Sequence, residues 1–494
     1  MRPITQLFEA LVDEDGDKPT IVDTDDHVQA LHELWSVTQE VVALLEPLPA
    51  GRVAVVADRY SIVLPALIAA WMTNRTIGLV SPLLPSGLMY QALSDFAPST
   101  VAEDVGGARV RDWKISHGAG LAAANSLPDP HTVLFTSGTT AAPKMVAHTP
   151  STLLASYRLV RAIRFELLAP EMLAQVGDPS STQSESWYGS RAAAGFPMRY
   201  LSALPVASIG GVTLGLQAIL GGEQIVDRPR YEPVAIMEAI RSFSITSLAA
   251  GPTTAQGMLR VARRGSFGHD WPLMVFGLGS STVPQGLCAD IEATFGCRTV
   301  TGYGATELGG VVATTRFTGT DRDRWSSLGR PVPGVAIRCD DTECLVQSPA
   351  LAVGYLNPDG TIAPLRKSNG WYATGDVLSC DADGIFHFEG RRSGLIVRAC
   401  KKINPEAIEA VIEGHPNVTK AGVVGVPSRI AGEEDVLALV ISDLPVVAAE
   451  LRRLCSDKLG NTWSPRFVRT VDTLPLSADG KIDRVALRHL AMGP

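Results

Sequence analysis

Strand-like and helix-like segments alternate along the first part of the chain, and this alternation is the strongest constraint on its fold. Residues 52–60 begin with an apolar, β-branched run typical of a buried strand, residues 61–74 have the apolar spacing of a helix, and residues 75–82 again favour a strand. Similar patterns recur at 132–138, 222–243 and 273–279. This order favours a parallel sheet with crossover helices. We therefore predict an α/β fold with a large N-terminal domain of mixed sheets packed by helices.

A change in charge near residue 391 divides the chain. At 494 residues the chain is too long for one ordinary hydrophobic core, so at least two domains are expected. Acidic residues outnumber basic ones before residue 391, whereas basic residues outnumber acidic ones from there on. We predict a large domain over residues 1–390, a hinge at 391–394 in which Gly394 supplies backbone freedom, and a small mobile α+β domain over 395–494.

Charge and hydropathy exclude some classes of protein. The net charge of -8 argues against a general nucleic-acid-binding protein, which usually has a basic excess. No run of about 18 apolar residues is present, so no transmembrane helix is expected, and the acidic first residues do not resemble a signal peptide. Seven cysteines without a CxxC pair indicate reduced thiols and a cytoplasmic protein. Cys339 and Cys344 lie close in sequence, but no nearby histidine supports a metal site.

The segment 132–148 carries the clearest chemical signal. An apolar strand runs into a turn rich in hydroxyl groups, which a lysine follows. Hydroxyls and backbone N–H groups in such a turn can hold phosphate oxygens, and an ammonium group adds positive charge. The Walker pattern is absent, because Met145 follows Lys144. We therefore predict a phosphate-binding loop of another type, made of Thr136, Ser137, Gly138, Thr139, Thr140 and Lys144.

Two further segments combine tight turns with chemically useful side chains. In 301–310, glycines flank Tyr303, which suits a ring that stacks on a nucleobase, and Glu307 is a candidate Mg²⁺ ligand beside a triphosphate. In 369–392, Asp376 follows a tight turn from which its carboxylate could accept both hydroxyls of a ribose. A simpler interpretation of each acid is a residue that stabilises a turn or faces solvent.

Three other local features are less specific on their own. Asp383 and Gly384 predict a hairpin turn in the strand pair that ends at Arg391. Lys481 follows a flexible turn near the end of the sequence. The polar, serine-rich segment 176–190 is either a surface loop or a mobile lid beside the site.

Together these segments resemble, in the same order and over nearly the whole chain, the adenylate-forming superfamily of acyl-CoA synthetases, nonribosomal-peptide adenylation domains and luciferases. The resemblance extends to residues 204–211, 279–284, 343–357 and 401–409. It implies that a carboxylate attacks the α-phosphate of ATP, that pyrophosphate leaves, and that a nucleophile, usually a thiol, captures the acyl-adenylate. Because an anion must approach a polyanion, catalysis is mostly electrostatic stabilisation and positioning.

The resemblance assigns a role to each motif residue. It places the phosphate-loop residues named above on the β- and γ-phosphates, Thr306 on the α-phosphate and Glu307 on Mg²⁺. It also implies that Tyr303 stacks on adenine and that Asp376 binds the ribose hydroxyls with help from Arg391. The residues expected to line the base are Gly279, Ser280, Ser281 and Gly302.

By the same resemblance, Lys481 reaches in from the small domain to bridge the carboxylate and the α-phosphate, after which the small domain rotates and a thiol tunnel opens. Three positions depart from the family pattern. Ala141 and Cys400 stand where glycine is usual, and Gly394 stands where Asp or Lys is common at the hinge. A side chain at Cys400 would narrow the passage for a pantetheine arm, which leaves CoA, a carrier protein or an amine open as the acceptor.

The segment 206–209 bears on the identity of the acid. Amino-acid-activating relatives place an Asp here to pair with the substrate ammonium group, whereas this chain has no acid in the segment. We therefore infer a carboxylic acid without an α-amino group, either aryl or medium acyl. The expected pocket residues are Ala207, Ser208, Ala250, Gly251 and Gly277.

The leading hypothesis is an enzyme, an acid–thiol ligase that uses ATP and Mg²⁺ to form acyl-AMP. The acyl group would pass to CoA or to the phosphopantetheine of an acyl or peptidyl carrier protein. Alternatives are a stand-alone ligase that loads a carrier protein or an amine, an NTPase or phosphoryl transferase, and a catalytically inactive relative. An NTPase would release ADP, whereas the ligase would release AMP and pyrophosphate.

Overall fold

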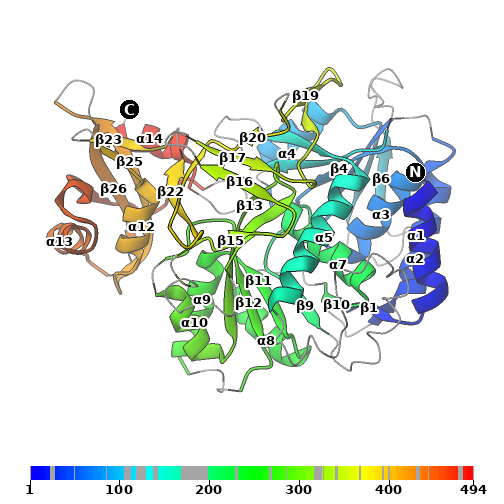
Figure 1. The fold of residues 1–494 in the computed structure, drawn as a ribbon, viewed down its shortest axis with the longest axis horizontal. Helices are drawn as coiled ribbons and strands as arrows, with labels where there is room; N and C mark the ends of the chain where they lie inside the picture. Colours follow the sequence, from blue (N-terminus) through cyan, green and yellow to red (C-terminus); the bar gives the residue numbers. More distant parts are fainter. Residues whose placement is uncertain are drawn as a thin grey trace.

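The computed structural model confirms the predicted α/β fold, with a large N-terminal and a small C-terminal domain (Figure 1). The described residues are 2–22, 28–48, 51–84, 86–104, 113–117, 129–136, 143–167, 198–227, 232–265, 267, 270–284, 286–315, 325, 327–339, 343–366, 369–391, 394–398, 401–429, 434–442, 444–476 and 482–492. The predictions that fall outside them concern Ser137, Gly138, Thr139, Thr140, Ala141, Cys400, Lys481, the segment 176–190, residues 392–393 of the hinge and the side chain of Arg391.

An eight-stranded sheet forms one layer of the large domain. Its order is β19-β18-β8-β7-β4-β3-β5-β6, and the four strands at its centre pair in parallel. The strands are β3 (Arg52–Val56), β4 (Thr76–Val80), β5 (Thr100–Glu103), β6 (Lys114–His117), β7 (Thr132–Thr136), β8 (Lys144–His148), β18 (Gly354–Leu356) and β19 (Ile362–Pro364). The expected strand, helix and strand of residues 52–82 are β3, α3 (Tyr60–Met72) and β4.

A nine-stranded sheet forms the second layer. Its order is β15-β14-β13-β12-β11-β9-β10-β1-β2, and the pairs from β13 to β1 are parallel. The strands are β1 (Pro19–Val22), β2 (Val28–Ala30), β9 (Arg199–Ser202), β10 (Gln224–Val226), β11 (Ser247–Ala250), β12 (Val275–Leu278), β13 (Arg298–Ala305), β14 (Gly310–Thr314) and β15 (Arg330–Pro331).

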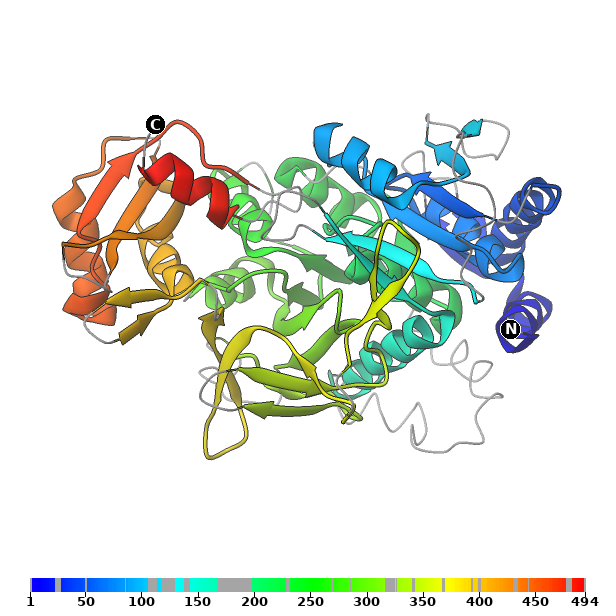
Figure 2. The same cartoon turned by 90° about the horizontal axis from the view of Figure 1, so that it is seen from above.

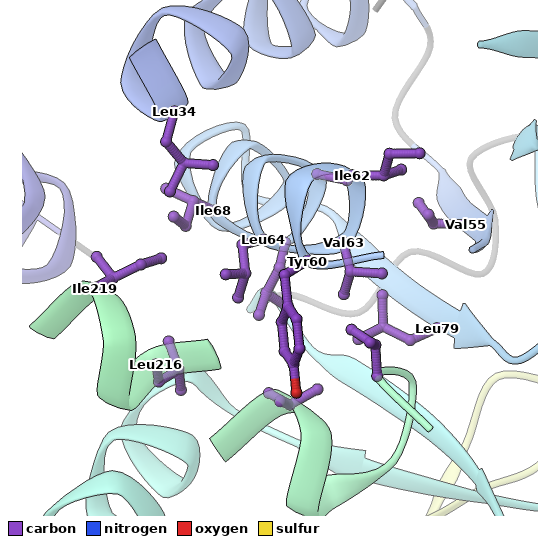
Figure 3. Close-up of a cluster of buried hydrophobic side chains, with 14 of the residues drawn as sticks. Leu34, Val55, Tyr60, Ile62, Val63, Leu64, Ile68, Leu79, Leu216 and Ile219 are labelled. Atoms are coloured by element: carbon purple, nitrogen blue, oxygen red, sulfur yellow. The ribbon is translucent and has the colours of Figure 1, made fainter. Parts of the chain in front are cut away.

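Helices pack on both sheets, and α3 is buried along almost its whole length. A helix that is apolar on every side belongs in an interior, and α3 lies against α2 and α7. Figure 3 shows Leu34 of α2 and Leu216 and Ile219 of α7 facing Leu64 and Ile68 of α3. The helices of the large domain are α1 (Arg2–Asp15), α2 (Leu31–Leu45), α3, α4 (Ser86–Phe96), α5 (Pro150–Leu167), α7 (Ile209–Gly221), α8 (Pro233–Ser242), α9 (Pro252–Arg263) and α10 (Leu287–Phe295).

Two small sheets lie near the junction with the C-terminal domain. One contains β16 (Ala336–Cys339), β17 (Cys344–Gln347) and β20 (Tyr372–Ala373), and the other contains β21 (Asp376–Cys380) and β22 (Phe386–Arg391). The turn predicted at Asp383 and Gly384 joins β21 to β22, and Gly384 has a φ of +76°. Glycine suits this left-handed conformation because it carries no Cβ atom.

The small domain lies to one side of the large one in both views (Figures 1 and 2). It has α+β composition, with a hairpin of two strands, a three-stranded sheet and helices. Its elements are β23 (Ile396–Arg398), β24 (Lys401–Ile403), α12 (Pro405–Glu413), β25 (Val418–Pro427), β26 (Glu434–Ser442), α13 (Ala448–Leu459), η3 (Asn461–Trp463), β27 (Phe467–Thr470) and α14 (Arg484–Met492). Within the described part of both domains, every helix is too short or too polar to cross a membrane.

Candidate active site

Glycines that leave space above the sheet follow the carboxyl ends of β11 and β12, whereas Gly302 in the neighbouring β13 packs against Val311, 3.2 Å from where its Cβ atom would be. The parallel register of these strands brings Gly251, Gly279 and Gly302 to the same edge. A Cβ atom added at Gly251 would meet nothing within 4 Å, and one at Gly279 would lie 3.5 Å from the carbonyl oxygen of Gly302, an ordinary contact. Ligands of open α/β sheets bind outside the carboxyl ends of parallel strands. Gly251 and Gly279 therefore leave room for a ligand.

The other two predicted pocket residues of these strands lie on opposite faces of the sheet. Gly277 precedes Gly279 by two residues, so the two share a face, and a Cβ atom at Gly277 would also make only ordinary contacts. Ala250 is buried on the other face, in the hydrophobic cluster that contains Leu278. Gly277 thus lies on the same face of the sheet as Gly251 and Gly279, whereas the side chain of Ala250 packs into the core on the other face.

Tyr303 and Asp376 form a buried polar pair beside this edge. Tyr303 follows Gly302 on β13, and its hydroxyl donates a hydrogen bond of 2.7 Å to Oδ2 of Asp376 at the start of β21. Burial and the charge of Asp376 hold the pKa of Tyr303 well above its ordinary value, so the hydroxyl keeps its proton. The backbone N–H of Asp376 donates to Oγ1 of Thr374 at 3.1 Å, which fixes the turn before the strand. The residues predicted to bind adenine and ribose therefore touch each other.

Tyr355, which the sequence analysis did not predict as a site residue, contacts both Lys144 and Glu307. The Tyr355 hydroxyl donates to Oε1 of Glu307 at 2.8 Å, and Nζ of Lys144 lies 5.3 Å from the centroid of the Tyr355 ring. Burial and the charge of Glu307 raise the pKa of Tyr355, so its hydroxyl remains a donor. Tyr355 is beside Lys144 because β18 pairs with β8, with Tyr355 opposite Val146. Only this long-range pairing marks Tyr355 as a site residue, since a tyrosine in a short strand resembles ordinary packing.

His148 fixes the turn that carries Thr306 and Glu307. Its Nε2 lies 2.9 Å from the Thr306 carbonyl oxygen, and its Nδ1 lies 3.1 Å from Oγ1 of Thr152. A carbonyl can only accept, so Nε2 carries the proton and donates. Burial lowers the pKa of His148 to about 4, which keeps the ring neutral. His148 ends the motif segment 132–148, but nothing local predicted its bond to Thr306.

The segment that contains Ala207 and Ser208 is held rigidly by the protein itself. The backbone N–H of Val206 donates to Oδ1 of the buried Asp58 at 2.8 Å. The Ser208 hydroxyl donates to the Pro205 carbonyl at 2.6 Å and accepts from the N–H of Gly211 at 3.1 Å, which caps α7. The hydroxyl of Ser208 is therefore used in structure, and the segment carries no charged side chain of its own. Sequence patterns gave no indication of Asp58.

The described flanks of the phosphate loop and of the ribose site lie in paired strands. Thr136 ends β7 directly opposite Lys144, which begins β8, so these two residues mark the base of the predicted phosphate loop. The backbone of Arg391 pairs with that of Asp376 across β21 and β22.

Ser280 and Ser281, which are predicted to line the base, are both exposed. Ser280 follows Gly279 with a φ of +73°, an uncommon conformation for a residue with a side chain.

Two hydrogen bonds join the described parts of the two domains. Oγ1 of Thr282, just after the predicted adenine-lining residues, donates to Oε2 of Glu406 on α12 at 2.6 Å. Nζ of Lys420 on β25 donates to Oγ1 of Thr253 on α9 at 3.2 Å. The first contact is partly buried and the second is exposed.

The segment that leads to Lys481 is anchored within the small domain. Leu476 and Ile482, the described residues on either side of the position of Lys481, form an antiparallel bridge. Arg484, two residues beyond the bridge, bonds both carboxylate oxygens of the buried Glu409. Burial raises the pKa of Glu409 to about 6, and the Arg484 charge opposes this shift. Arg484 thus connects the residues that follow Lys481 to α12, the helix that also contacts Thr282.

Two family models match the chain. The model of the AMP-binding enzyme family matches residues 12–357, and that of the AMP-binding enzyme C-terminal domain matches residues 407–481. The chain belongs to the AMP-binding enzyme family. The resemblance to the adenylate-forming superfamily and the assignment as an enzyme are thereby confirmed.

Individual relatives of this AMP-binding enzyme are distant. It is 28% identical over 298 residues to the 2-succinylbenzoate–CoA ligase of Bacillus licheniformis, an alignment that covers 58% of this chain and 60% of the relative. The match thus spans less than two thirds of that relative's length.

Solved structures share the fold over the whole chain. The o-succinylbenzoate CoA synthetase of Bacillus subtilis, in complex with an acyl-adenylate, superposes with a TM-score of 0.77 at 19% identity, covering 98% of each chain. The amide bond synthetase of Marinactinospora thermotolerans superposes with a TM-score of 0.76 at 21% identity, covering 98% of this chain and 99% of the other. These superpositions support the two-domain architecture.

Proposed function

We propose that this AMP-binding enzyme uses ATP to activate a carboxylic acid without an α-amino group, aryl or medium acyl, and then transfers the acyl group to the thiol of CoA. One observation carries the proposal: the strand and turn at 302–307 connect the Tyr303–Asp376 pair to the Glu307–Tyr355 pair, beside an edge that glycines leave open. Aromatic, carboxylate and ammonium groups along one edge match the base, ribose and phosphates of a nucleotide.

The nucleotide would lie along this edge. In the proposal, the Tyr303 ring stacks on adenine, with Gly279, Ser280, Ser281 and Gly302 lining the base. Asp376 accepts from the ribose hydroxyls with help from Arg391, and Thr306 contacts the α-phosphate. The ammonium group of Lys144 faces the β- and γ-phosphates together with Thr136 and the loop residues Ser137, Gly138, Thr139 and Thr140. Hydrogen bonds to charged phosphate oxygens are among the strongest in proteins.

Mg²⁺ would be shared between Glu307 and the phosphates. Among the described residues, no three His, Cys, Asp or Glu side chains gather into a metal site of their own. One carboxylate fits Mg²⁺, which usually keeps several waters and is bound by one or two carboxylates plus substrate phosphates. The ion would supply neutralisation of phosphate charge, and the Tyr355 hydroxyl would orient the Glu307 carboxylate that holds it.

The acid would lie near the segment 206–208 and beside Gly251 and Gly277. The Ser208 hydroxyl already bonds Pro205 and Gly211, so this segment offers the acid no polar side chain. A substrate ammonium group would be left without a partner there, at a cost of several kcal/mol. An acid whose far end is apolar suits this pocket.

Lys481 is the proposed catalytic residue that bridges the attacking carboxylate and the α-phosphate. The bridge between Leu476 and Ile482 and the bonds from Arg484 to Glu409 fix the described residues on either side of Lys481, which supports this role. In the proposal, residues 391–394 then act as the hinge about which the domain at 395–494 turns. The alternative acceptors are a carrier protein and an amine. A side chain at Cys400 would narrow the passage for the pantetheine arm of CoA and of a carrier protein alike, and would leave only the amine unaffected.

The test is a pyrophosphate-release assay over a panel of carboxylic acids that includes amino acids as controls. We expect AMP and pyrophosphate with aryl or medium acyl acids, and no stimulation by amino acids. Mass spectrometry with CoA, a phosphopantetheinylated carrier protein or an amine then identifies the acceptor. Release of ADP, or pyrophosphate release that no acid stimulates, would contradict the proposal.

A further inference from the structure

Two cysteines face each other across a hairpin near the proposed nucleotide site. In the antiparallel pair β16–β17, Cys339 lies directly opposite Cys344, and both are reduced. Directly opposed residues of antiparallel strands have Cα atoms roughly 4.5–5.5 Å apart. Disulfides span Cα separations of about 4.4–6.8 Å, so the two Cα atoms lie within bridging range. The Cβ atoms of opposed residues are roughly 4.5–5.5 Å apart, however, and must approach to about 3.8 Å before a bridge can form.

Both thiols point toward the cluster that contains Tyr303. Cys344 is fully buried in this cluster, and Cys339 packs against it while remaining partly exposed. Burial, followed by the neighbouring Cys339 and the Asp376 carboxylate, raises the pKa of the Cys344 thiol to about 12. Cys344 thus packs in the same cluster as Tyr303, whose hydroxyl donates a hydrogen bond to Asp376.

A chain of hydrogen bonds connects Cys344 to Asp376. The Cys344 carbonyl accepts from Oγ1 of Thr374 at 3.0 Å and from the backbone N–H of Thr374 at 3.0 Å. The same Thr374 hydroxyl accepts from the N–H of Asp376 at 3.1 Å. A shift of Cys344 would therefore move the turn that positions the Asp376 carboxylate against Tyr303.

We propose that Cys339 and Cys344 are a modification site, a dithiol that a low-molecular-weight disulfide such as oxidised glutathione converts to a cross-strand disulfide, weakening nucleotide binding. This inference rests on the proposed nucleotide site at Tyr303 and Asp376. The bridge pulls β16 and β17 together and displaces Cys344 from its contact with Thr374.

The chemistry is two successive exchanges. The Cys339 thiolate attacks one sulfur of oxidised glutathione, forming a mixed disulfide and releasing one glutathione thiolate. Cys344 then loses its proton and attacks Sγ of Cys339, which releases the second glutathione. Two protein thiols are oxidised by two electrons, and one glutathione disulfide is reduced to two glutathiones. The second step accelerates as the pH rises, because the pKa of the Cys344 thiol is high.

The experiment treats the full chain with oxidised glutathione and follows it by peptide mapping and by ATP binding. In the wild type we expect a peptide linked through Cys339 and Cys344, an ATP Kd raised about tenfold, and recovery after dithiothreitol. Cys339→Ser should form no such bridge and should keep its affinity for ATP. The matched control is Cys380→Ser, which removes an exposed thiol outside the pair and should leave the response unchanged.

Absence of the Cys339–Cys344 peptide in folded wild type, or its formation with an unchanged ATP Kd, would overturn the inference. Failure of the proposed ligase function has a separate signature. It would show as no acid-dependent pyrophosphate release by the reduced enzyme, whereas mass spectrometry and ATP binding report on the dithiol without any catalysis.

Discussion

At the scale of single residues, the site depends on bonds between partners far apart in the sequence. Tyr355 lies 48 residues from Glu307, and His148 lies 158 residues from Thr306. The residue type of Glu307 suits a Mg²⁺ ligand, and the resemblance to the family places Thr306 on the α-phosphate. The motifs did not predict Tyr355 or His148, whose roles arise only from the strands that bring them close.

Replacing Tyr355 by Phe tests the orientation of Glu307. The ring beneath Lys144 remains, and only the hydrogen bond of 2.8 Å to the carboxylate is lost. A hydrogen bond to a charged group contributes about 1.5–3 kcal/mol, so we expect a rise of about tenfold or more in the Mg²⁺ concentration needed for half-maximal pyrophosphate exchange. An unchanged magnesium requirement in a variant with the wild-type melting temperature would show that Glu307 needs no such orientation.

His148 should make stability depend on pH between about 4 and 6.5. Burial lowers its pKa from 6.5 to about 4, so below pH 6.5 the unfolded chain binds a proton that the folded protein does not. The stabilisation is fully present above pH 6.5 and is lost as the pH falls toward 4. We expect the wild type to lose about 2 kcal/mol more than His148→Gln between pH 7 and pH 5. Urea unfolding at both pH values measures this, and equal losses would contradict the assignment.

At the scale of elements, strand ends position the site, and glycines there serve two different purposes. Gly277 could accept a methyl group without strain, since the nearest atom to an added Cβ would be 3.6 Å away, an ordinary contact. Gly211, at the start of α7, is required by packing, because an added Cβ would lie 2.3 Å from the Pro205 carbonyl oxygen. A sequence alone does not distinguish these two glycines, since the difference lies in what surrounds them.

A matched pair of substitutions separates the two purposes. Gly277→Ala should leave the melting temperature nearly unchanged but raise KM for the acid about tenfold, because a methyl group occupies pocket space. Gly211→Ala should destabilise the protein by on the order of 1–3 kcal/mol, because backbone atoms must shift. Thermal unfolding and acid-dependent pyrophosphate release measure both effects. A destabilised Gly277→Ala with an unchanged KM would contradict the placement of the acid.

Much of the fold was predictable from such local patterns, and part of the site was not. The alternation around β3, α3 and β4 and the hairpin turn at Gly384 depend on local periodicity and turn chemistry, which a sequence displays directly. Ala250 illustrates the limit. It was predicted to line the pocket because it is small, but the side chains of a strand alternate, and the register of β11 turns this one into the core.

At the scale of the whole molecule, the hydrogen bonds between the two domains bear on the proposed rotation of the small domain. Among the described residues, Thr282 bonds Glu406 at 2.6 Å in a partly buried position, whereas the bond from Lys420 to Thr253 is exposed. A partly buried bond to a carboxylate stabilises more than an exposed one. Of these two bonds, the one from Thr282 should therefore contribute more to the arrangement of the domains seen here.

Thr282→Val should shift the molecule away from this arrangement. We expect cleavage between the domains by a dilute protease to accelerate about tenfold, because the loss of a hydrogen bond to a carboxylate favours separation of the domains. Thr253→Val is the matched control and should change the cleavage rate by less than a factor of about two, in line with the small contribution of exposed polar contacts. Equal effects of the two substitutions would show that Glu406 has no special role.

The proposed ligase mechanism is tested most directly by acid-dependent pyrophosphate release in Lys481→Ala, compared with the wild type. We expect the variant to bind ATP as tightly as the wild type and to lose acid-dependent release by about 100-fold or more, as when a single donor to developing charge is removed. Turnover at the wild-type rate would contradict the claim that Lys481 bridges the acid and the α-phosphate.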